Sequence, residues 1–285
     1  MPSIATLRHT PWSLSKVKCA RRCPQEFQLR YVDRIPEPEV APDTRVGKAV
    51  HAALEAVLLH APVDRALATA REELLHDEER RRFDTLAGSV KKFRERIDAF
   101  RGQRRVRTEL VEHRLAVNSE LAPTGFFARD AFFRGVWDVG FLYDDGCLAV
   151  VDHKTGVRRE IFEFSDQLEG YAILAAAHVA QVKKVFLGVH FVADAAMEWI
   201  EPIGLDAVRR DFAPRVVAEL EQAARELAGG PEPRPSGWCR RCSYRSICPA
   251  TRRVDRAAWT PLEPDPDADP ASDPDAVAAG ERAAP

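Results

Sequence analysis

The feature that most constrains this chain of 285 residues is a set of cysteines split between its two ends. Cys239, Cys242 and Cys248 form a C-x2-C-x5-C pattern, and Cys23 stands alone near the start of the chain. Thiolates are soft ligands that suit zinc or an iron–sulfur cluster, and such a site usually takes four. If these four cysteines share one metal centre, the two ends of the chain lie together and the remaining residues fold between them.

Cellular location decides how the cysteines are interpreted. No stretch of the sequence is apolar over the length of a membrane span, and the first residues lack the apolar core of a signal peptide. We therefore expect a cytoplasmic protein without a membrane partner, in which thiols stay reduced and six cysteines favour metal ligation over disulfides. Cys19 lies four residues before Cys23 and is an alternative fourth ligand.

The charge of the chain is unevenly distributed. Residues 260–285 hold seven acidic residues and one basic residue, so the rest of the chain carries about +4 although the net charge is −2. Residues 91–114 hold nine basic and four acidic residues, and residues 234–256 hold seven basic residues and one aspartate. Such runs suit a phosphate backbone, although each by itself is more often a solvated helix face. The acidic, proline-rich tail at 260–285 is expected to be disordered.

The period of the apolar residues changes along the chain and predicts a mixed sheet flanked by helices, an α/β fold. Helical spacing precedes and follows a block of strands, and the helices near residues 64–101 are charged, weakly patterned and expected to be peripheral. The expected helices cover about 44–58, 64–101, 165–180 and 205–227, and the expected strands cover 109–117, 132–143, 147–151, 184–192 and 197–200.

Two aspartates and a lysine stand on two neighbouring predicted strands. Asp152 and Lys154 end an apolar strand, and residues two apart on a strand point to the same face. A tight-turn signal at 144–146 folds the preceding strand back, so that Asp138 can face Asp152. Facing carboxylates repel unless a cation lies between them, and oxygen ligands select magnesium or manganese. The alternative for Asp152 and Lys154 is a simple ion pair at the end of a strand.

His51 is the fourth candidate of this group. It lies near the apolar stripe of the helix at 44–58, so its ring is expected to face the sheet. Glu55 lies one helical turn later and can orient His51. The alternative is a core histidine that is satisfied by its neighbours, which is the commoner case for a single histidine.

Several motifs occur in one order along residues 12–249, and together they resemble the RecB-like branch of the PD-(D/E)XK nuclease superfamily. This branch includes the AddB nuclease domain and the CRISPR-adaptation nucleases with an iron–sulfur cluster. The matching segments are Ser13–Ser15 with Cys23, Pro24 and Phe27, then Gly47–Glu55, Gly135–Asp138, Val151–Gly156, Gln167–Tyr171, and the triplet Cys239, Cys242 and Cys248.

The resemblance implies a restriction-endonuclease-like core and a role for each matched residue. His51, Asp138 and Asp152 would bind a catalytic Mg²⁺ or Mn²⁺ ion together with the backbone carbonyl of His153, and Lys154 would position or activate the attacking water. Gln167 and Tyr171 would support the site and contact the DNA. The four cysteines, Cys23, Cys239, Cys242 and Cys248, would hold a 4Fe–4S cluster that joins the terminal segments, with zinc as the alternative.

The expected function is hydrolysis of DNA phosphodiester bonds by a metal-dependent deoxyribonuclease. The resemblance favours an exonuclease that prefers single strands or free ends in repair or recombination, with any helicase partner on a separate polypeptide. Alternatives are a CRISPR-adaptation nuclease that trims spacers beside integrase partners, and an inactive DNA-binding scaffold. The expected organisation is one domain over 1–259, with its core at about 44–203, a helical insert at about 62–106, and cysteine-bearing segments at 12–35 and 236–250.

Overall fold

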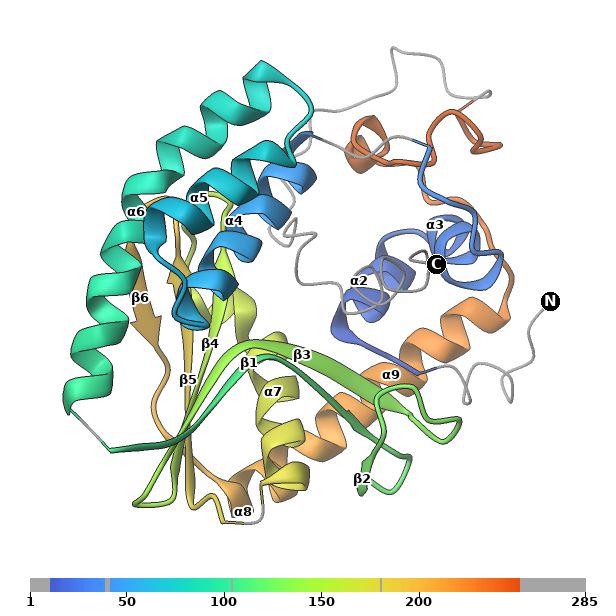
Figure 1. Ribbon diagram of the computed structural model, residues 1–285. Coiled ribbons are helices and arrows are strands. Elements are labelled where there is room, and N and C mark those ends of the chain that lie inside the picture. Colours follow the sequence, from blue (N-terminus) through green and yellow to red (C-terminus); the bar gives the residue numbers. More distant parts are fainter. Residues whose placement is uncertain (1–10, 39–41, 104, 180, 252–285) are drawn as a thin grey trace.

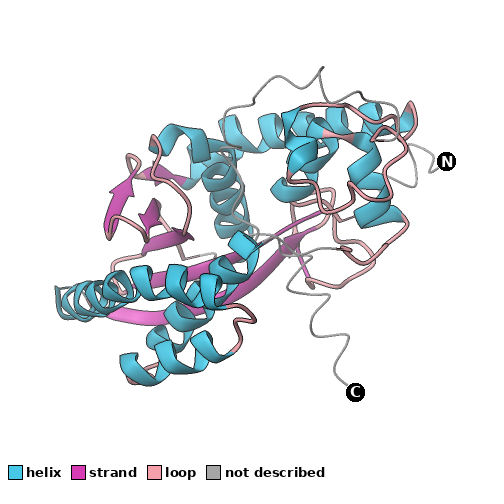
Figure 2. Cartoon of the chain, turned by 90° about the horizontal axis from the view of Figure 1, so that it is seen from above, coloured by secondary structure: helices cyan, strands magenta, loops and turns pink. Residues whose placement is uncertain are grey.

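A mixed β-sheet lies between two layers of helices in the computed structural model, which describes residues 11–38, 42–103, 105–179 and 181–251 (Figure 1). The view from above shows the helices on both sides of the strands and a further group of short helices at one end (Figure 2). The central sheet flanked by helices is the α/β architecture that the apolar pattern predicts. This arrangement is consistent with a restriction-endonuclease-like fold.

Seven strands form the sheet in the order β2-β1-β3-β4-β5-β6, with β7 also paired to β5. Among the strands of the described residues, β4 and β5 are the one pair that runs in parallel, because the helix that connects them crosses one face of the sheet. The long strands are β1 (Val106–Val117), β3 (Phe133–Tyr143), β4 (Cys147–Lys154) and β5 (Lys184–Phe191). The short strands are β2 (Pro123–Thr124), β6 (Ala196–Trp199) and β7 (Ile203–Gly204).

Three helices cover the first face of the sheet: α4 (Pro42–Leu58), α5 (Val63–Glu72) and α6 (Asp77–Gln103). Their apolar side chains form one core with the side chains of that face of β3 and β4. The expectation that the helices near 64–101 are peripheral is wrong. Phe83, Val90 and Phe93 of α6 are fully buried, because one narrow apolar stripe of this mostly charged helix packs on α4 and the sheet.

The second face is covered by α7 (Ser165–His178) and α9 (Ala213–Ala228). The helix expected over 205–227 is interrupted: α8 (Leu205–Ala207) leads through a π-helical turn (Val208–Phe212) into α9, and Pro214 lies in the first turn of α9. Apolar residues of α7 and α9 form a second core with the other face of the strands. The central strands β3, β4 and β5 are therefore buried on both faces, whereas most of β1 and β6 is partly exposed.

The two ends of the described chain lie side by side (Figure 1). The N-terminal segment contains α2 (Leu14–Arg22), α3 (Pro24–Phe27) and a π-helical turn (Gln28–Val32), and the C-terminal segment contains a 3₁₀ turn (Gly237–Arg240). The Tyr244 hydroxyl donates to the Ile35 carbonyl at 2.9 Å, and the Trp238 indole donates to the Glu26 carboxylate at 3.1 Å. Two part-buried hydrogen bonds therefore join the N-terminal and C-terminal segments.

The predicted strands occur at the expected places. β4 ends with Asp152 and Lys154, as expected, and pairs with β5 over its whole length. The acidic tail at 260–285 lies outside the described residues. Within the described ranges, no helix combines the length and the apolar character that crossing a bilayer requires.

Candidate active site

Asp138 and Asp152 lie where β3 and β4 separate. The two strands pair from Leu142 with Leu148 up to Val139 with Val151, and the two aspartates are the next residue on each strand. Beyond this point the Asp138 carboxylate replaces strand pairing, because its Oδ2 accepts the backbone N–H of His153 at 2.5 Å. Both aspartates are almost completely buried. The fork therefore holds two carboxylates where burial of charge is costly without a cation.

Asp152 is held by side chains from α7 and from its own strand. Its Oδ1 accepts hydrogen bonds from Gln167 Nε2 and from the Tyr171 hydroxyl, both at 2.8 Å. Its Oδ2 lies 2.9 Å from the Lys154 ammonium, which also lies over the Phe164 ring at 5.5 Å from the centroid. Gln167 and Tyr171 are one turn apart on α7, so one face of this helix positions the carboxylate.

His51 approaches Asp138 from α4 on the other side of the fork. Its Nδ1 lies 3.5 Å from Asp138 Oδ1, and both side chains are buried. The ring faces the sheet because neighbouring residues of α4, among them Val50 and Leu54, pack into the core of that face. Glu55 lies near enough to interact electrostatically with His51 and Asp138.

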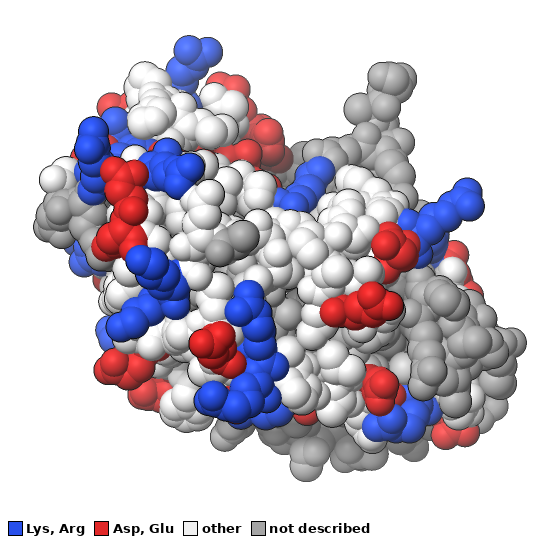
Figure 3. Space-filling view, turned by 90° about the horizontal axis from the view of Figure 1, so that it is seen from below, with Lys and Arg blue, Asp and Glu red and all other residues white. Residues whose placement is uncertain are grey.

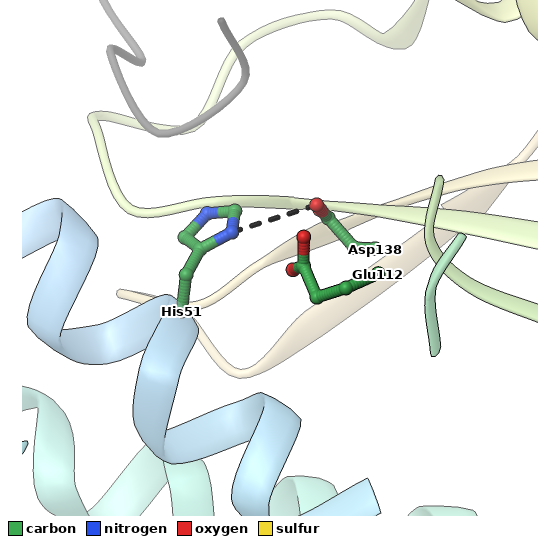
Figure 4. Close-up of side chains that lie close together, drawn as sticks. All are labelled: His51, Glu112 and Asp138. Carbon is green, nitrogen blue, oxygen red and sulfur yellow. Dashed lines mark ion pairs between the residues drawn. The ribbon is translucent and has the colours of Figure 1, made fainter. Parts of the chain in front are cut away.

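Glu112 belongs to the same group, which the regular alternation of residues 109–117 does not predict. It comes from β1, and one ligand atom each from His51, Glu112 and Asp138 lie within 4.8 Å of one another (Figure 4). Glu112 has a φ of 45°, in the left-handed region that costs a residue with a side chain about 1–3 kcal/mol. Strained backbone of this kind concentrates at functional sites.

A pair of buried histidines lies behind this cluster. His153 Nδ1 and His190 Nδ1 are 3.1 Å apart, so one ring donates its proton to the other. Phe93 of α6 stacks on His190 and meets the edge of His153. Burial, and then the charge of His153, lower the pKa of His190 well below its usual value, so His190 is neutral. The contact between the two rings restricts His153, whose backbone N–H donates to the Asp138 carboxylate.

The electrostatics of the cluster are those of a site that attracts a cation. Burial raises the pKa of Glu112 to about 8, and the charge of Asp138 contributes to this shift. The pKa of Asp138 is lowered to about 2, because attraction to His51 and hydrogen bonds from His51 and His153 outweigh burial. Burial and the charge of Asp152 raise the pKa of Tyr171 well above its usual value, so its hydroxyl keeps its proton.

The predicted site residues thus lie around one fork of the sheet but form two neighbouring sets. On the side of α4 lie His51 and Asp138, together with Glu112. On the side of α7 lie Asp152, Lys154, Gln167 and Tyr171. Among the His, Cys, Asp and Glu side chains of the described residues, His51, Glu112 and Asp138 are the only three whose ligand atoms all lie within 4.8 Å of one another. An imidazole and two carboxylates suit a divalent cation such as Mg²⁺ or Mn²⁺.

The four cysteines predicted to form a cluster line one pocket between the terminal segments: Cys23, Cys239, Cys242 and Cys248. Glu26, Trp238 and Tyr244 line the same pocket. All four are half-buried and none forms a disulfide. Burial raises the pKa of the Cys242 thiol to about 12, to which the charges of Glu26, Cys23 and Cys239 contribute. Cys19 does not line the pocket and is buried in the core beneath α7 and α9.

Ion pairs occupy several described side chains of the two basic runs, which the structure covers at 91–103, 105–114 and 234–251. Examples are Lys91 with Asp64, Arg101 with Glu109, and Arg234 with Glu226. On the face of the molecule in Figure 3, basic and acidic side chains are interspersed. The described parts of the runs are therefore weaker indicators of a nucleic-acid path than their composition suggests.

Comparison with known proteins places this geometry in a family. The chain is similar to the crystal structure of SSO0001, with 17% identity and a TM-score of 0.39 over 85% of this chain and 87% of that one. It is also similar to the crystal structure of a protein from Eubacterium rectale that is described as a candidate exonuclease, with 13% identity and a TM-score of 0.48 over 91% of this chain and 92% of that one. No curated protein matches the chain in sequence. The sequence model of the PD-(D/E)XK nuclease superfamily matches residues 11–249, which include every predicted site residue. The chain therefore belongs to the PD-(D/E)XK nuclease superfamily.

Proposed function

We propose that this protein is a metal-dependent deoxyribonuclease of the RecB-like branch that hydrolyses DNA phosphodiester bonds, with single-stranded or free ends as its preferred substrate. The observation that carries the proposal is the fork between β3 and β4. It buries Asp138 and Asp152 at opposed positions, with His51 beside one aspartate and Lys154 beside the other. A buried arrangement of two carboxylates, an imidazole and an ammonium suits hydrolysis of a phosphodiester better than it suits a structural role.

The residues that would hold the metal are His51, Asp138 and Asp152, with the backbone carbonyl of His153. When bound, a divalent ion polarises the phosphate and lowers the pKa of a coordinated water. The N–H of His153 fixes the Asp138 carboxylate, and Gln167 and Tyr171 fix Asp152. Hydrogen bonds of this kind orient ligand oxygens before binding and reduce the reorganisation that the reaction requires.

Lys154 is assigned the positioning of the attacking water. Its ammonium lies 2.9 Å from Asp152 Oδ2 and is buried against Phe164, so its position is restricted. Lysine offers three donors and no acceptor, so it can hold a water beside Asp152 and stabilise negative charge on the phosphate. The protonated Tyr171 hydroxyl donates its hydrogen bond to Asp152 and keeps that carboxylate an acceptor.

For the cysteines we propose a 4Fe–4S cluster that joins the terminal segments. The supporting observation is the common pocket of Cys23 with the C-terminal triplet. Four thiolates in one pocket suit either zinc or an iron–sulfur cluster by their softness, and the resemblance to the RecB-like branch favours the cluster. Protein purified without oxygen is expected to be brown and to contain iron and sulfide; a colourless protein with stoichiometric zinc would refute the cluster.

The nuclease proposal is tested by digesting end-labelled single- and double-stranded oligonucleotides with Mn²⁺ or Mg²⁺. Asp152→Asn keeps the size of the side chain and removes its charge, and we expect it to lower the cleavage rate by at least about a hundredfold. Asp194→Asn, in the exposed turn between β5 and β6, is the matched control and should cleave like the wild type.

The same assay separates the alternatives. The length of the labelled products shows polarity and distinguishes removal of end nucleotides from internal cleavage. Binding of DNA without cleavage by the wild type, in either metal, would contradict the proposal and support an inactive scaffold. Cleavage that requires an added integrase would favour a role in spacer processing.

A further inference from the structure

Glu112 is the one carboxylate of the cluster to which the family motifs assign no role. It meets His51 and Asp138 from a third element, β1, so that α4, β1 and β3 each supply one side chain (Figure 4). We infer that Glu112 is a direct ligand of the divalent cation that His51 and Asp138 bind. This inference rests on the proposed function and adds a carboxylate to its metal site.

The backbone of β3 turns Asp138 toward this cluster. Trp137 belongs to the core beneath α7, whereas Val139, two residues later, belongs to the core beneath α4. In a regular strand, residues two apart share a face. The alternation of β3 is therefore interrupted at Asp138, which reaches His51 on the side of α4.

The backbone of β1 is interrupted at the same level. Val111 packs in the core beneath α4 and Leu115 in the core beneath α7, although residues four apart in a regular strand share a face. The interruption includes Glu112 with its φ of 45°. The register between β1 and β3 is nevertheless unbroken here, from Val111 with Val139 to His113 with Trp137, so Glu112 lies opposite Asp138. Two facing strands thus depart from regular geometry together, and both departures bring a carboxylate to the same point.

The spacing of the donor atoms suits a single ion. Mg²⁺ and Mn²⁺ hold ligands at about 2.1 Å, which places the donors about 3–4 Å apart around one octahedral ion. The atoms of His51, Glu112 and Asp138 lie within 4.8 Å of one another, so small side-chain movements bring all three to one cation. Ordinary rotation about χ angles supplies movements of this size.

Glu112 also interacts with Arg114, and a role limited to balancing that charge is the alternative. The two roles differ in what they predict for metal affinity. A ligand contributes to the affinity for the ion in the absence of DNA. A partner of Arg114 that does not touch the ion influences the affinity only through its charge at a distance, and its neutralisation should change the affinity little.

The test is Mn²⁺ binding to the full-length protein without DNA, after EDTA treatment and desalting. Free Mn²⁺ is measured by its six-line electron paramagnetic resonance signal, and calorimetry gives the stoichiometry. Glu112→Gln keeps the shape of the side chain, and Glu112→Asn places at this φ a residue that tolerates the left-handed region. Glu120→Gln, in the exposed turn after β1, removes the same charge outside the cluster and is the control. Asp138→Asn reports on the site itself.

We expect both Glu112 variants to bind Mn²⁺ at least about tenfold more weakly than the wild type, and Glu120→Gln to bind within about twofold of it. The spectrum of the bound ion should also change in Glu112→Gln, because a carboxylate has left its coordination sphere. Wild-type affinity in both Glu112 variants, together with loss of binding in Asp138→Asn, would overturn the inference and leave the proposed function standing. A wild type that binds no Mn²⁺ and cuts no DNA would overturn both.

Discussion

At the scale of single residues, the reactivity of the site depends on how Lys154 and the two aspartates share a buried space. In the absence of metal the ammonium neutralises Asp152, and His51 with the His153 N–H stabilises Asp138. Removal of one partner from such a buried pair is costly because the other charge remains. The same groups therefore contribute to both stability and chemistry, and experiments must separate the two effects.

Lys154→Met removes the ammonium and keeps most of the side-chain volume. We expect DNA cleavage at saturating Mn²⁺ to fall about a hundredfold or more, because the attacking water loses its donor. Mn²⁺ affinity should change by only a few-fold, because Lys154 is not a ligand. Lys184→Met, at the exposed start of β5, is the control. A variant that cleaves like the wild type would remove Lys154 from the catalytic set.

Glu112 gives the metal-free protein a specific dependence on pH. In the native state its pKa is raised to about 8 from an ordinary value of 4.5. Between these values the unfolded chain releases the proton that the native protein retains, so stability declines as the pH rises from about 4.5 to 8. Glu112→Gln lacks this loss and should be more stable than the wild type at pH 8.5 by up to about 5 kcal/mol, since the pKa rises by about 3.5 units at about 1.4 kcal/mol each, with a much smaller difference at pH 5.

Urea unfolding in EDTA at the two pH values measures this difference. Asp138 does not contribute to it, because the pKa of Asp138 is about 2, which lies below the window, and because both proteins contain Asp138. A stability difference between the two proteins that does not change between pH 5 and pH 8.5 would show that Glu112 does not hold its proton in the native state.

The sequence reveals some of these residues and conceals others for physical reasons. The turn at 144–146 sets the register of β3 and β4, and this register places Asp138 opposite Asp152. Glu112 could not be assigned to the site, because its direction depends on an interruption that regular alternation does not predict. His190 stands in an apolar strand, and only the parallel pairing of β4 with β5 places it beside His153.

At the scale of secondary-structure elements, two helices hold the two halves of the site. α4 supplies His51 from one face of the sheet, and α7 supplies Gln167 and Tyr171 from the other. The sequence predicts both helices because their apolar residues are numerous. The sequence does not predict the packing of α6, because charged residues in this helix outnumber the apolar residues of its buried stripe, which include Phe93. Phe93 in turn packs on the histidine pair behind Asp138.

The close approach of α7 to α2 and β3 can be tested with two glycines inside helices. A Cβ at Gly170 would lie 2.9 Å from Leu14 Cδ1 and 3.0 Å from Phe133 Cζ, whereas a Cβ at Gly88 in α6 meets nothing within 4 Å. We expect Gly170→Ala to destabilise the protein by about 1–3 kcal/mol through overpacking. Gly88→Ala should stabilise it by about 0.5–1 kcal/mol through helix propensity. Chemical denaturation measures both, and a stabilising Gly170→Ala would show that α7 has room to move.

At the scale of the whole molecule, the protein is closed by contacts between its ends. Tyr244, Trp238 and Ser243 of the C-terminal segment bind Ile35, Glu26 and Glu37 of the N-terminal segment. A metal centre at the four cysteines would close a loop of about 200 residues and remove unfolded-state entropy accordingly. The sequence suggests this closure from the split cysteines alone, whereas the polar contacts depend on the folded geometry.

Cys242→Ser tests whether the cysteines act as one clamp. We expect hydrogen exchange to speed up in residues 12–35 and 236–250 together, with little change in β3 and β4. The reason is that loss of one ligand releases a centre to which both segments contribute. Cys147→Ser, at the start of β4 and outside the cysteine pocket, is the control. Faster exchange in only one of the two segments would contradict a shared centre.

The most direct measurement of the central claim is an anomalous difference map from a crystal of this protein soaked in Mn²⁺. The account predicts a peak in the fork between β3 and β4, bound by His51, Asp138 and Asp152 at about 2.0–2.3 Å. A map with full Mn²⁺ occupancy elsewhere, or with no peak between the two aspartates, would contradict it.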